Sequence, residues 1–165
     1  MTYPAFDISP VPIPGPDAVA PEPFHGLYGM PMFVTVPTPD LAASLDFWIR
    51  GLGFFELFSV PDHLIHLRRW AFQDVLLVPG DRPVDAPALS VSFSCVLGEL
   101  DTIAAACEQA APGCTTGPTP MPWNSVELRV RTPENAQVVM TAARPYDPDS
   151  PEAAYLRAIG IEAPR

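Results

Sequence analysis

The order of strand and helix patterns is the same in the two halves of this chain. Each half begins with a strand pattern, continues into an amphipathic helix and ends in further apolar or alternating strand segments. A proline-broken linker at about residues 80–87 separates the halves. The 165 residues therefore predict an α+β fold of two βαβββ modules. Each helix covers one face of its sheet, and a curved mixed sheet that lines a cavity is one way to bury the other face.

The first predicted module covers residues 30–80. Its expected elements are a strand at 32–36, a helix that ends near residue 50, and strands at 54–60, 64–69 and 74–78. Thr38 is the expected N-cap of the helix, with Pro39 at the first helical position and Asp40 in the first turn. Gly51 and Gly53 end the helix.

The second predicted module covers residues 88–145. Its expected elements are a strand at 89–96, a helix from about 100 to 111, and strands at 125–131 and 137–141. The strand at 89–96 alternates strictly, so its three serines share one face. The second strand of this module has only a weak sequence pattern. We expect residues 114–123 to form a proline-rich loop in its place.

The two ends of the chain are predicted to lie outside the modules. Seven of the 23 prolines fall within residues 1–29, which predicts either an extended arm or a disordered leader. Four apolar residues could anchor this arm on another surface, such as that of a second subunit: Phe6, Ile8, Phe24 and Tyr28. In the tail at 146–165, Ser150 caps a short helix.

Charge limits the classes of partner. The chain has 19 acidic and 9 basic residues and a net charge of −10, which disfavours nucleic acid and attracts cationic small molecules. No apolar run is long enough for a transmembrane helix, and no basic residue lies in the first 25 positions, as a secretory signal would require. We therefore expect a soluble, cytoplasmic protein that binds neither nucleic acid nor membrane.

The cysteines indicate no disulfide framework. Cys95, Cys107 and Cys114 form no CxxC pair and are odd in number. We expect them to be small, buried, unreactive side chains in a reducing compartment rather than zinc ligands or nucleophiles.

Two motifs resemble those of the vicinal oxygen chelate superfamily, which includes glyoxalases, extradiol dioxygenases and bleomycin-resistance proteins. The first is TPDLAASLDFW at 38–48, followed by GLGF at 51–54. The second is Pro122-Trp123, a strand at 127–131 and the turn at 132–135, where Thr132 and Ala136 depart from the usual turn residues. The resemblance covers about residues 30–145 and implies the paired-module fold, with a cavity completed in a homodimer.

The same resemblance implies where a metal would bind. Enzymes of the superfamily hold a divalent metal with one side chain from each of four strands, and these positions fall here on Phe33, Leu76, Ser92 and Val139. None is His, Glu or Gln, and neighbouring positions are no better, so we expect no metal, cofactor or catalytic residue of the family type. His63 and His66 would point in opposite directions on a strand, which argues against a shared metal site.

Strand alternation and loop position instead predict a ligand-binding face. Polar strand residues would line the cavity and aromatic residues would form its rim. The predicted ligand-binding residues are Phe33, Thr35, Phe55, Phe58, His66, Trp70, Phe72, Leu76, Ser90, Ser92, Ser94, Trp123, Glu127 and Arg129. Ordinary solvent-facing strands and dimer contacts are the competing interpretations.

The leading functional hypothesis is a non-enzymatic protein that sequesters an antibiotic or natural product, with a small aromatic or polar organic ligand. The alternative is a metal-independent isomerase, cyclase or lyase of natural-product metabolism, with Glu127, Asp74 or a histidine as acid or base. A third possibility is a structural or regulatory protein that binds its partner through the proline-rich arm.

Overall fold

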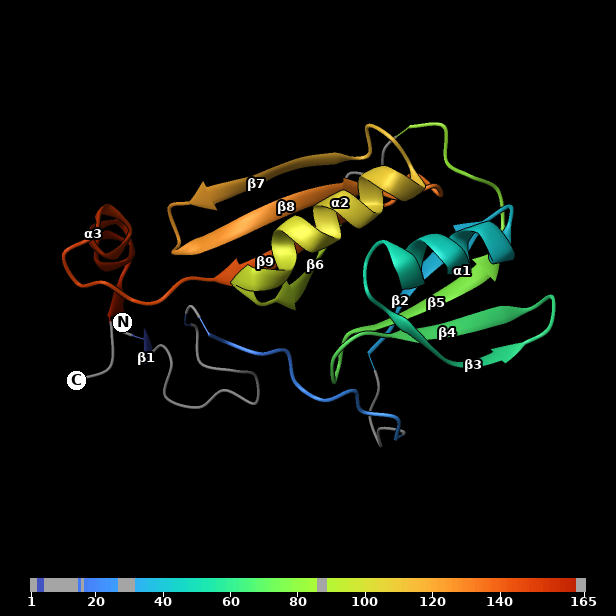
Figure 1. Cartoon of the computed structure of the whole chain (residues 1–165), viewed down its shortest axis with the longest axis horizontal. Coiled ribbons are helices and arrows are strands. Elements are labelled where there is room, and N and C mark those ends of the chain that lie inside the picture. The colour runs from blue at the N-terminus through green and yellow to red at the C-terminus, as the bar shows by residue number, and fades with distance from the viewer. Residues whose placement is uncertain (1–2, 5–14, 16, 27–31, 86–88, 163–165) are drawn as a thin grey trace.

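The computed structural model describes residues 3–4, 15, 17–26, 32–85 and 89–162 (Figure 1). Its helices and strands are β1 (Tyr3–Pro4), β2 (Val34–Thr38), α1 (Leu41–Arg50), β3 (Phe55–Val60), β4 (Leu64–Arg68), β5 (Asp74–Pro79), β6 (Ser90–Cys95), a 3₁₀ turn (Leu97–Glu99), α2 (Leu100–Ala110), β7 (Thr115–Met121), β8 (Ser125–Arg131), β9 (Gln137–Ala143), α3 (Pro151–Ala158) and β10 (Ile161–Glu162).

Two four-stranded mixed sheets have the same topology. Their strand orders are β2-β5-β4-β3 and β6-β9-β8-β7. In each sheet the first strand pairs in parallel with the last, and the other neighbours are antiparallel. This confirms the predicted α+β fold with a repeated βαβββ unit. The short strands β1 and β10 pair separately with each other.

The start of the first module differs from the sequence prediction. The strand begins at Val34 rather than Met32, and Asp40 rather than Thr38 caps α1. The Asp40 carboxylate accepts a hydrogen bond from the Ala43 backbone N–H at 3.0 Å. Thr38 instead lies buried in β2, with its hydroxyl 2.7 Å from that of Ser44. The predicted cap was therefore wrong by two residues, whereas the helix does end at Gly51.

The expected loss of a strand at 114–123 was also wrong. The segment forms β7, which pairs with β8 through a register shift between Thr116 and Thr119. β7 contains Pro118 and Pro120, which have no backbone N–H to donate. It lies at the edge of its sheet, where one side of the strand pairs with no neighbour and proline is tolerated.

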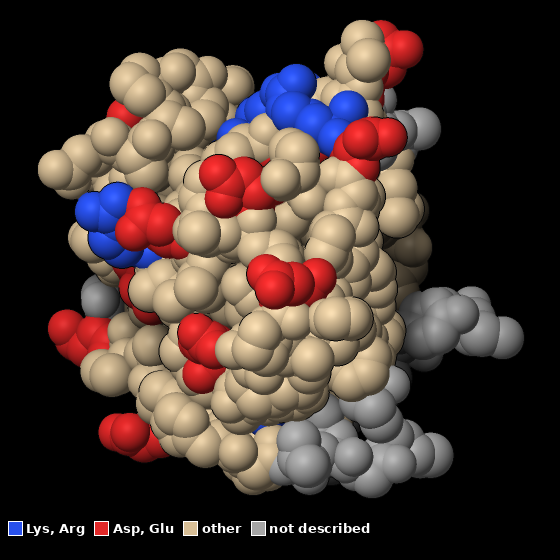
Figure 2. Space-filling view, turned by 90° about the vertical axis from the view of Figure 1, so that its right-hand side faces the viewer, with Lys and Arg blue, Asp and Glu red and all other residues tan. Residues whose placement is uncertain are grey.

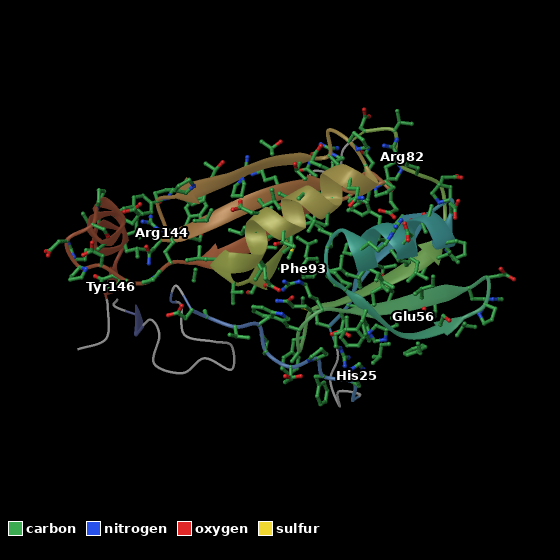
Figure 3. All side chains as sticks on the ribbon, in the orientation of Figure 1. His25, Glu56, Arg82, Phe93, Arg144 and Tyr146 are labelled. Atoms are coloured by element: carbon green, nitrogen blue, oxygen red, sulfur yellow. The ribbon has the colours of Figure 1, made fainter. Side chains whose placement is uncertain are left out.

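One hydrophobic core joins the two modules. Phe93 on β6 of the second module makes edge contacts with Trp48 and Phe54 of the first, with ring centroids 6.3 and 5.1 Å apart. Figure 3 shows Phe93 between the modules. A Cβ atom at Gly51 would lie 3.2 Å from Cys107 Sγ, so this glycine allows the end of α1 to approach α2 closely. The helices and the helix-facing sides of both sheets therefore share one interior.

Among the described residues, each helix is too short or too polar to span a bilayer. The three cysteines are free thiols; Cys95 and Cys107 are buried and Cys114 is half-buried. Acidic side chains are spread over the face of the molecule drawn in Figure 2, and basic side chains lie mainly near its edges.

Candidate functional site

A buried polar cluster lies on the face of the first sheet opposite α1. Alternation along β4 places His66 and Arg68 on the same side, and the antiparallel register sets Arg68 directly opposite Asp74 on β5. All three side chains are almost fully buried. Charged groups are seldom buried this completely unless they are paired, so their arrangement decides what the face can do.

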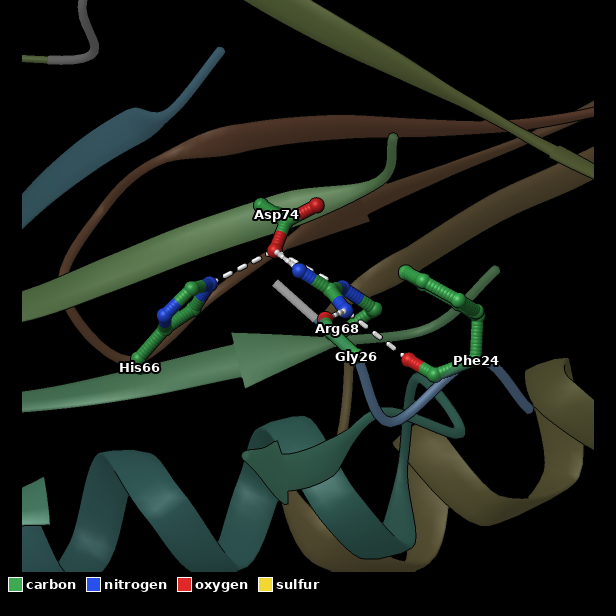
Figure 4. Close-up of polar contacts among 5 residues, drawn as sticks. All are labelled: Phe24, Gly26, His66, Arg68 and Asp74. Atoms are coloured by element: carbon green, nitrogen blue, oxygen red, sulfur yellow. Dashed lines mark hydrogen bonds and ion pairs between the residues drawn. The ribbon is translucent and has the colours of Figure 1, made fainter. Parts of the chain in front are cut away.

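One carboxylate oxygen organises the cluster (Figure 4). Asp74 Oδ1 lies 2.6 Å from His66 Nε2, 2.9 Å from Arg68 Nε and 2.8 Å from Arg68 Nη2. Because an ionised carboxylate can only accept, the imidazole donates from Nε2. In a neutral ring Nδ1 is then an acceptor, and within the part of the chain that the structure describes it is buried without a hydrogen-bond partner.

Two phenylalanines flank the imidazole. The rings of Phe33 and Phe58 meet the His66 ring edge-on, at centroid distances of 5.1 and 5.0 Å. Phe33 is 39% and Phe58 45% exposed, whereas His66 is 2% exposed. The structure thus brings together three predicted ligand-binding residues, with a buried ring nitrogen between two partly exposed phenyl rings.

The N-terminal arm contacts the same cluster. Arg68 Nη1 donates to the backbone carbonyl oxygens of Phe24 at 2.8 Å and Gly26 at 2.6 Å, and its guanidinium lies 5.5 Å from the centre of the Phe24 ring. His25 packs against Phe55 with ring centroids 4.6 Å apart, below the first sheet in Figure 3. This part of the arm therefore packs on its own chain. The other expected anchors, Phe6, Ile8 and Tyr28, lie outside the described residues.

The corresponding face of the second sheet is more open and more polar. Register aligns the residues of three strands in the rows Ser94–Thr141–Glu127, Ser92–Val139–Arg129 and Ser90–Gln137–Arg131, all of them polar except Val139. The three serines and Arg129 are exposed, as alternation predicted. This face offers hydroxyl, amide, carboxylate and guanidinium groups to a ligand.

An aromatic side chain is fixed at the edge of this polar face. Trp123, which is 44% exposed, donates from its indole Nε1 to Glu127 Oε1 at 2.9 Å. The sequence predicted both residues as ligand contacts, and the structure places them in direct contact. The carboxylate orients the ring, so less side-chain freedom would be lost when a ligand stacks on it.

The sequence predicted Trp70 at the exposed rim of the cavity, but the structure does not place it there. It is 5% exposed, and its ring lies 4.9 Å from the guanidinium of Arg69. Arg69 is held in turn by the Ser94 carbonyl oxygen at 2.6 Å and by the Glu99 carboxylate at 2.8 Å. Trp70 therefore packs at the junction of the modules, while Phe72 in the same turn is exposed.

Sequence reasoning missed the role of Arg68. Its position two residues after His66 on an alternating strand was the available indication, because i and i+2 share a face. The pairing with Asp74 additionally required the strand register, which the sequence does not provide.

A small pocket lies between the modules. It has a volume of about 160 Å³ and brings together the predicted residues Thr35 of β2 and Ser90 of β6. Its other lining residues come from β2, α1, the linker, β6, the turn that leads into β9 and the start of β9: Val34, Val36, Pro37, Trp48, Pro83, Leu89, Val91, Glu134, Asn135, Ala136 and Gln137. We call it the inter-module pocket.

The superfamily's metal does not fit the residues of this chain. The four expected positions carry Phe33, Leu76, Ser92 and Val139, of which only serine has a side-chain donor atom. Within the described ranges, no group of three His, Cys, Asp or Glu side chains is placed to hold a metal. His63 is exposed in a turn, where its Nδ1 lies 2.8 Å from the Pro61 carbonyl oxygen, whereas His66 is buried.

No family model and no curated protein matches this sequence. Solved structures do match its fold. A fosfomycin resistance protein, FosX, from Listeria monocytogenes has a TM-score of 0.58 and 14% identity over 71% of this chain and 93% of that one.

Two further structures are similar. An integron cassette protein from the mobile metagenome of the Halifax Harbour sewage outfall has a TM-score of 0.54 and 21% identity, over 70% of this chain and 99% of that one. A bleomycin resistance determinant encoded on transposon Tn5 has a TM-score of 0.51 and 16% identity, over 68% and 96%. Together with the repeated βαβββ topology, these similarities show that the chain has the vicinal oxygen chelate fold.

Proposed function

We propose that this protein binds and sequesters an antibiotic or natural product without changing it chemically. The observation that carries the proposal is the Trp123 indole, held by Glu127 beside the open polar face of the second sheet. An aromatic ligand would stack on the indole and form hydrogen bonds with the exposed serines of β6, Ser90, Ser92 and Ser94. The net charge of −10 favours a cationic ligand.

The chemistry of the site and the similar structures support this proposal. The positions that hold the metal in the superfamily carry no suitable set of donor atoms here. This favours a binding role over metal-dependent catalysis. One of the similar structures is a bleomycin resistance determinant and another is a fosfomycin resistance protein. Bleomycin is therefore the first ligand to test.

The test is calorimetric titration of the full chain with bleomycin and with a panel of aromatic cationic natural products. We expect saturable binding, and mass spectrometry should recover the ligand unchanged after hours of incubation. Trp123→Ala should weaken binding at least tenfold because the stacking surface is lost. Tyr155→Ala, which removes a similarly exposed aromatic ring on α3, is the matched control and should leave affinity unchanged. Equal affinities for Trp123→Ala and wild type would contradict the assignment.

A second candidate function rests on the His66–Asp74 pair. Asp74 holds the imidazole through Nε2 and leaves Nδ1 buried with no hydrogen-bond partner among the described residues, which is how a general base is held in many enzymes. A metal-independent isomerase, cyclase or lyase would use Nδ1 to accept a proton from its substrate. Time-dependent conversion of a bound ligand, lost in His66→Gln but retained in His63→Gln, would establish this function in place of sequestration.

A further inference from the structure

The inter-module pocket combines mostly apolar walls with a buried carboxylate. It is lined by Glu134, which is 2% exposed and whose two carboxylate oxygens accept no hydrogen bond from the described residues. A second lining residue, Trp48, has a buried indole N–H that is likewise without a partner. Buried polar groups in folded proteins are nearly always satisfied, so two unsatisfied groups around one cavity suggest that a ligand completes them.

Two arginines contact the turn that contains Glu134, but among the described residues neither forms an ion pair with its carboxylate. Arg82 Nε donates to the Pro133 carbonyl oxygen at 2.6 Å, and Arg131 Nη1 donates to Asn135 Oδ1 at 2.7 Å. Asn135 Nδ2 in turn holds the linker through the Pro83 carbonyl oxygen at 3.0 Å. The turn is thus held in place, and no residue in the described part of the chain supplies a cation to the Glu134 carboxylate.

An ionised carboxylate that is buried without a partner is strongly unfavourable, because it loses its hydration and gains no compensating contact. A ligand that brings one positive charge and hydrogen-bond donors would remove that penalty. The apolar walls, such as Val34, Val36 and Val91, would cover the rest of such a ligand. The excess of acidic residues over the whole chain also favours a cation over an anion.

We propose that the inter-module pocket binds a compact organic ammonium ion, with its charged nitrogen at the Glu134 carboxylate and its hydrocarbon part between the two modules. The volume limits the size of the ligand. Cavities that hold drug-sized molecules measure about 300–1,000 Å³, whereas an apolar cavity of about 150 Å³ holds benzene. A pocket of about 160 Å³ therefore suits an amine of about six heavy atoms rather than an antibiotic.

This site is independent of the proposed sequestration site, because Trp123 and Glu127 do not line it. Loss of antibiotic binding in Trp123→Ala should therefore leave ammonium binding intact. Conversely, Glu134→Gln should weaken ammonium binding at least tenfold without affecting the Trp123 face. The two proposals can thus fail separately.

The experiment is a titration of the full chain with n-butylammonium, followed by two-dimensional NMR of the tryptophan indole N–H groups. The chain has three tryptophans, and Trp123→Phe and Trp70→Phe assign the remaining resonance to Trp48. We expect a saturable shift of the Trp48 resonance with n-butylammonium. The neutral n-butanol and the anionic butyrate, which have similar hydrocarbon parts, should bind at least tenfold more weakly.

The variants give a second readout. Glu134→Gln keeps the shape of the side chain but removes its charge, and it should reduce n-butylammonium affinity at least tenfold. Glu127→Gln, a matched change on the open face, should leave this affinity unchanged. Equal binding of n-butanol and n-butylammonium to the wild type would overturn the proposal. So would the lack of any saturable shift, or unchanged affinity in a folded Glu134→Gln variant. The comparison of the three ligands on the wild type decides the question even if that variant does not fold.

Discussion

Asp74 shows how a single buried charge is accommodated in this protein. Its Oδ1 atom receives hydrogen bonds from both His66 and Arg68, and the guanidinium supplies the opposite charge within the same buried layer. If one partner of a buried ion pair is removed, the other is left charged and without hydration, which costs far more than breaking an exposed pair.

Replacement of Arg68 should therefore be strongly destabilising. Arg68→Met should lower the free energy of unfolding by about 3–5 kcal/mol, measured by urea denaturation, because Asp74 would remain buried without its cation. The control is Arg50→Met, which breaks an exposed ion pair with Asp46 on α1 and should cause no measurable change. Similar losses in the two variants would contradict this account of the buried cluster.

The cysteines give a prediction about reactivity and pH. Burial raises the pKa of Cys95 and of Cys107 from 9.0 to about 12, so neither thiol ionises near neutral pH. Iodoacetamide should therefore modify the half-buried Cys114 first, and the other two only after unfolding. Peptide mass spectrometry after timed labelling would measure this order. Early modification of Cys107 would show that the core opens more readily than its packing indicates.

The same shifts make stability depend on pH. Between pH 9 and about 12, cysteines of the unfolded chain lose protons that Cys95 and Cys107 retain in the folded protein. The folded state then binds more protons than the unfolded state, so the free energy of unfolding should fall as the pH rises through this range. Substitution of both cysteines by alanine should make the decline shallower.

At the level of elements, the sequence predicted the module order and most strands, because apolar alternation and glycine stops are local features. The strand 125–131 was predicted with the bounds that the structure gives. β7 was not, because its glycine and prolines are incompatible with a central strand and only its place at a sheet edge permits them. The exposure of Trp70 was predicted wrongly for a related reason: its position in a loop does not reveal that the side chain is buried.

The candidate sites were predictable to different degrees. Trp123 and Glu127 could be identified because alternation and a loop position are visible along the chain. The His66–Asp74–Arg68 cluster and the Glu134 carboxylate depend on cross-strand register and on packing between modules. Such long-range contacts leave little pattern in a single sequence.

The N-terminal arm is expected to stabilise the first sheet through Phe24. Phe24 lies against the Arg68 guanidinium at 5.5 Å, a cation–π contact beside two hydrogen bonds from the same guanidinium. Phe24→Ala should lower the free energy of unfolding by about 1 kcal/mol, measured by urea denaturation. Val19→Ala changes an exposed apolar residue of the same arm and should have no effect. An unchanged stability in Phe24→Ala would show that the arm is not fixed to the first sheet.

At the level of the whole molecule, the half-exposed phenyl rings of Phe33 and Phe58 favour assembly. They contact His66 on the first sheet's face opposite α1, where a second copy of the chain could cover them. We predict a homodimer, so light scattering coupled to gel filtration should give twice the mass of one chain. Phe58→Glu should shift the protein toward the monomer, whereas Phe72→Glu, in an exposed turn, should not. A monomer at all concentrations would contradict the prediction.

The shared core has a thermodynamic consequence. Because Phe93 of the second module packs on Trp48 and Phe54 of the first, neither module can unfold without exposing the apolar surface of the other. The two repeats should therefore melt in a single calorimetric transition. A ligand bound at the Trp123 face would then slow amide hydrogen exchange in the most protected strands of the first module, although it touches none of them.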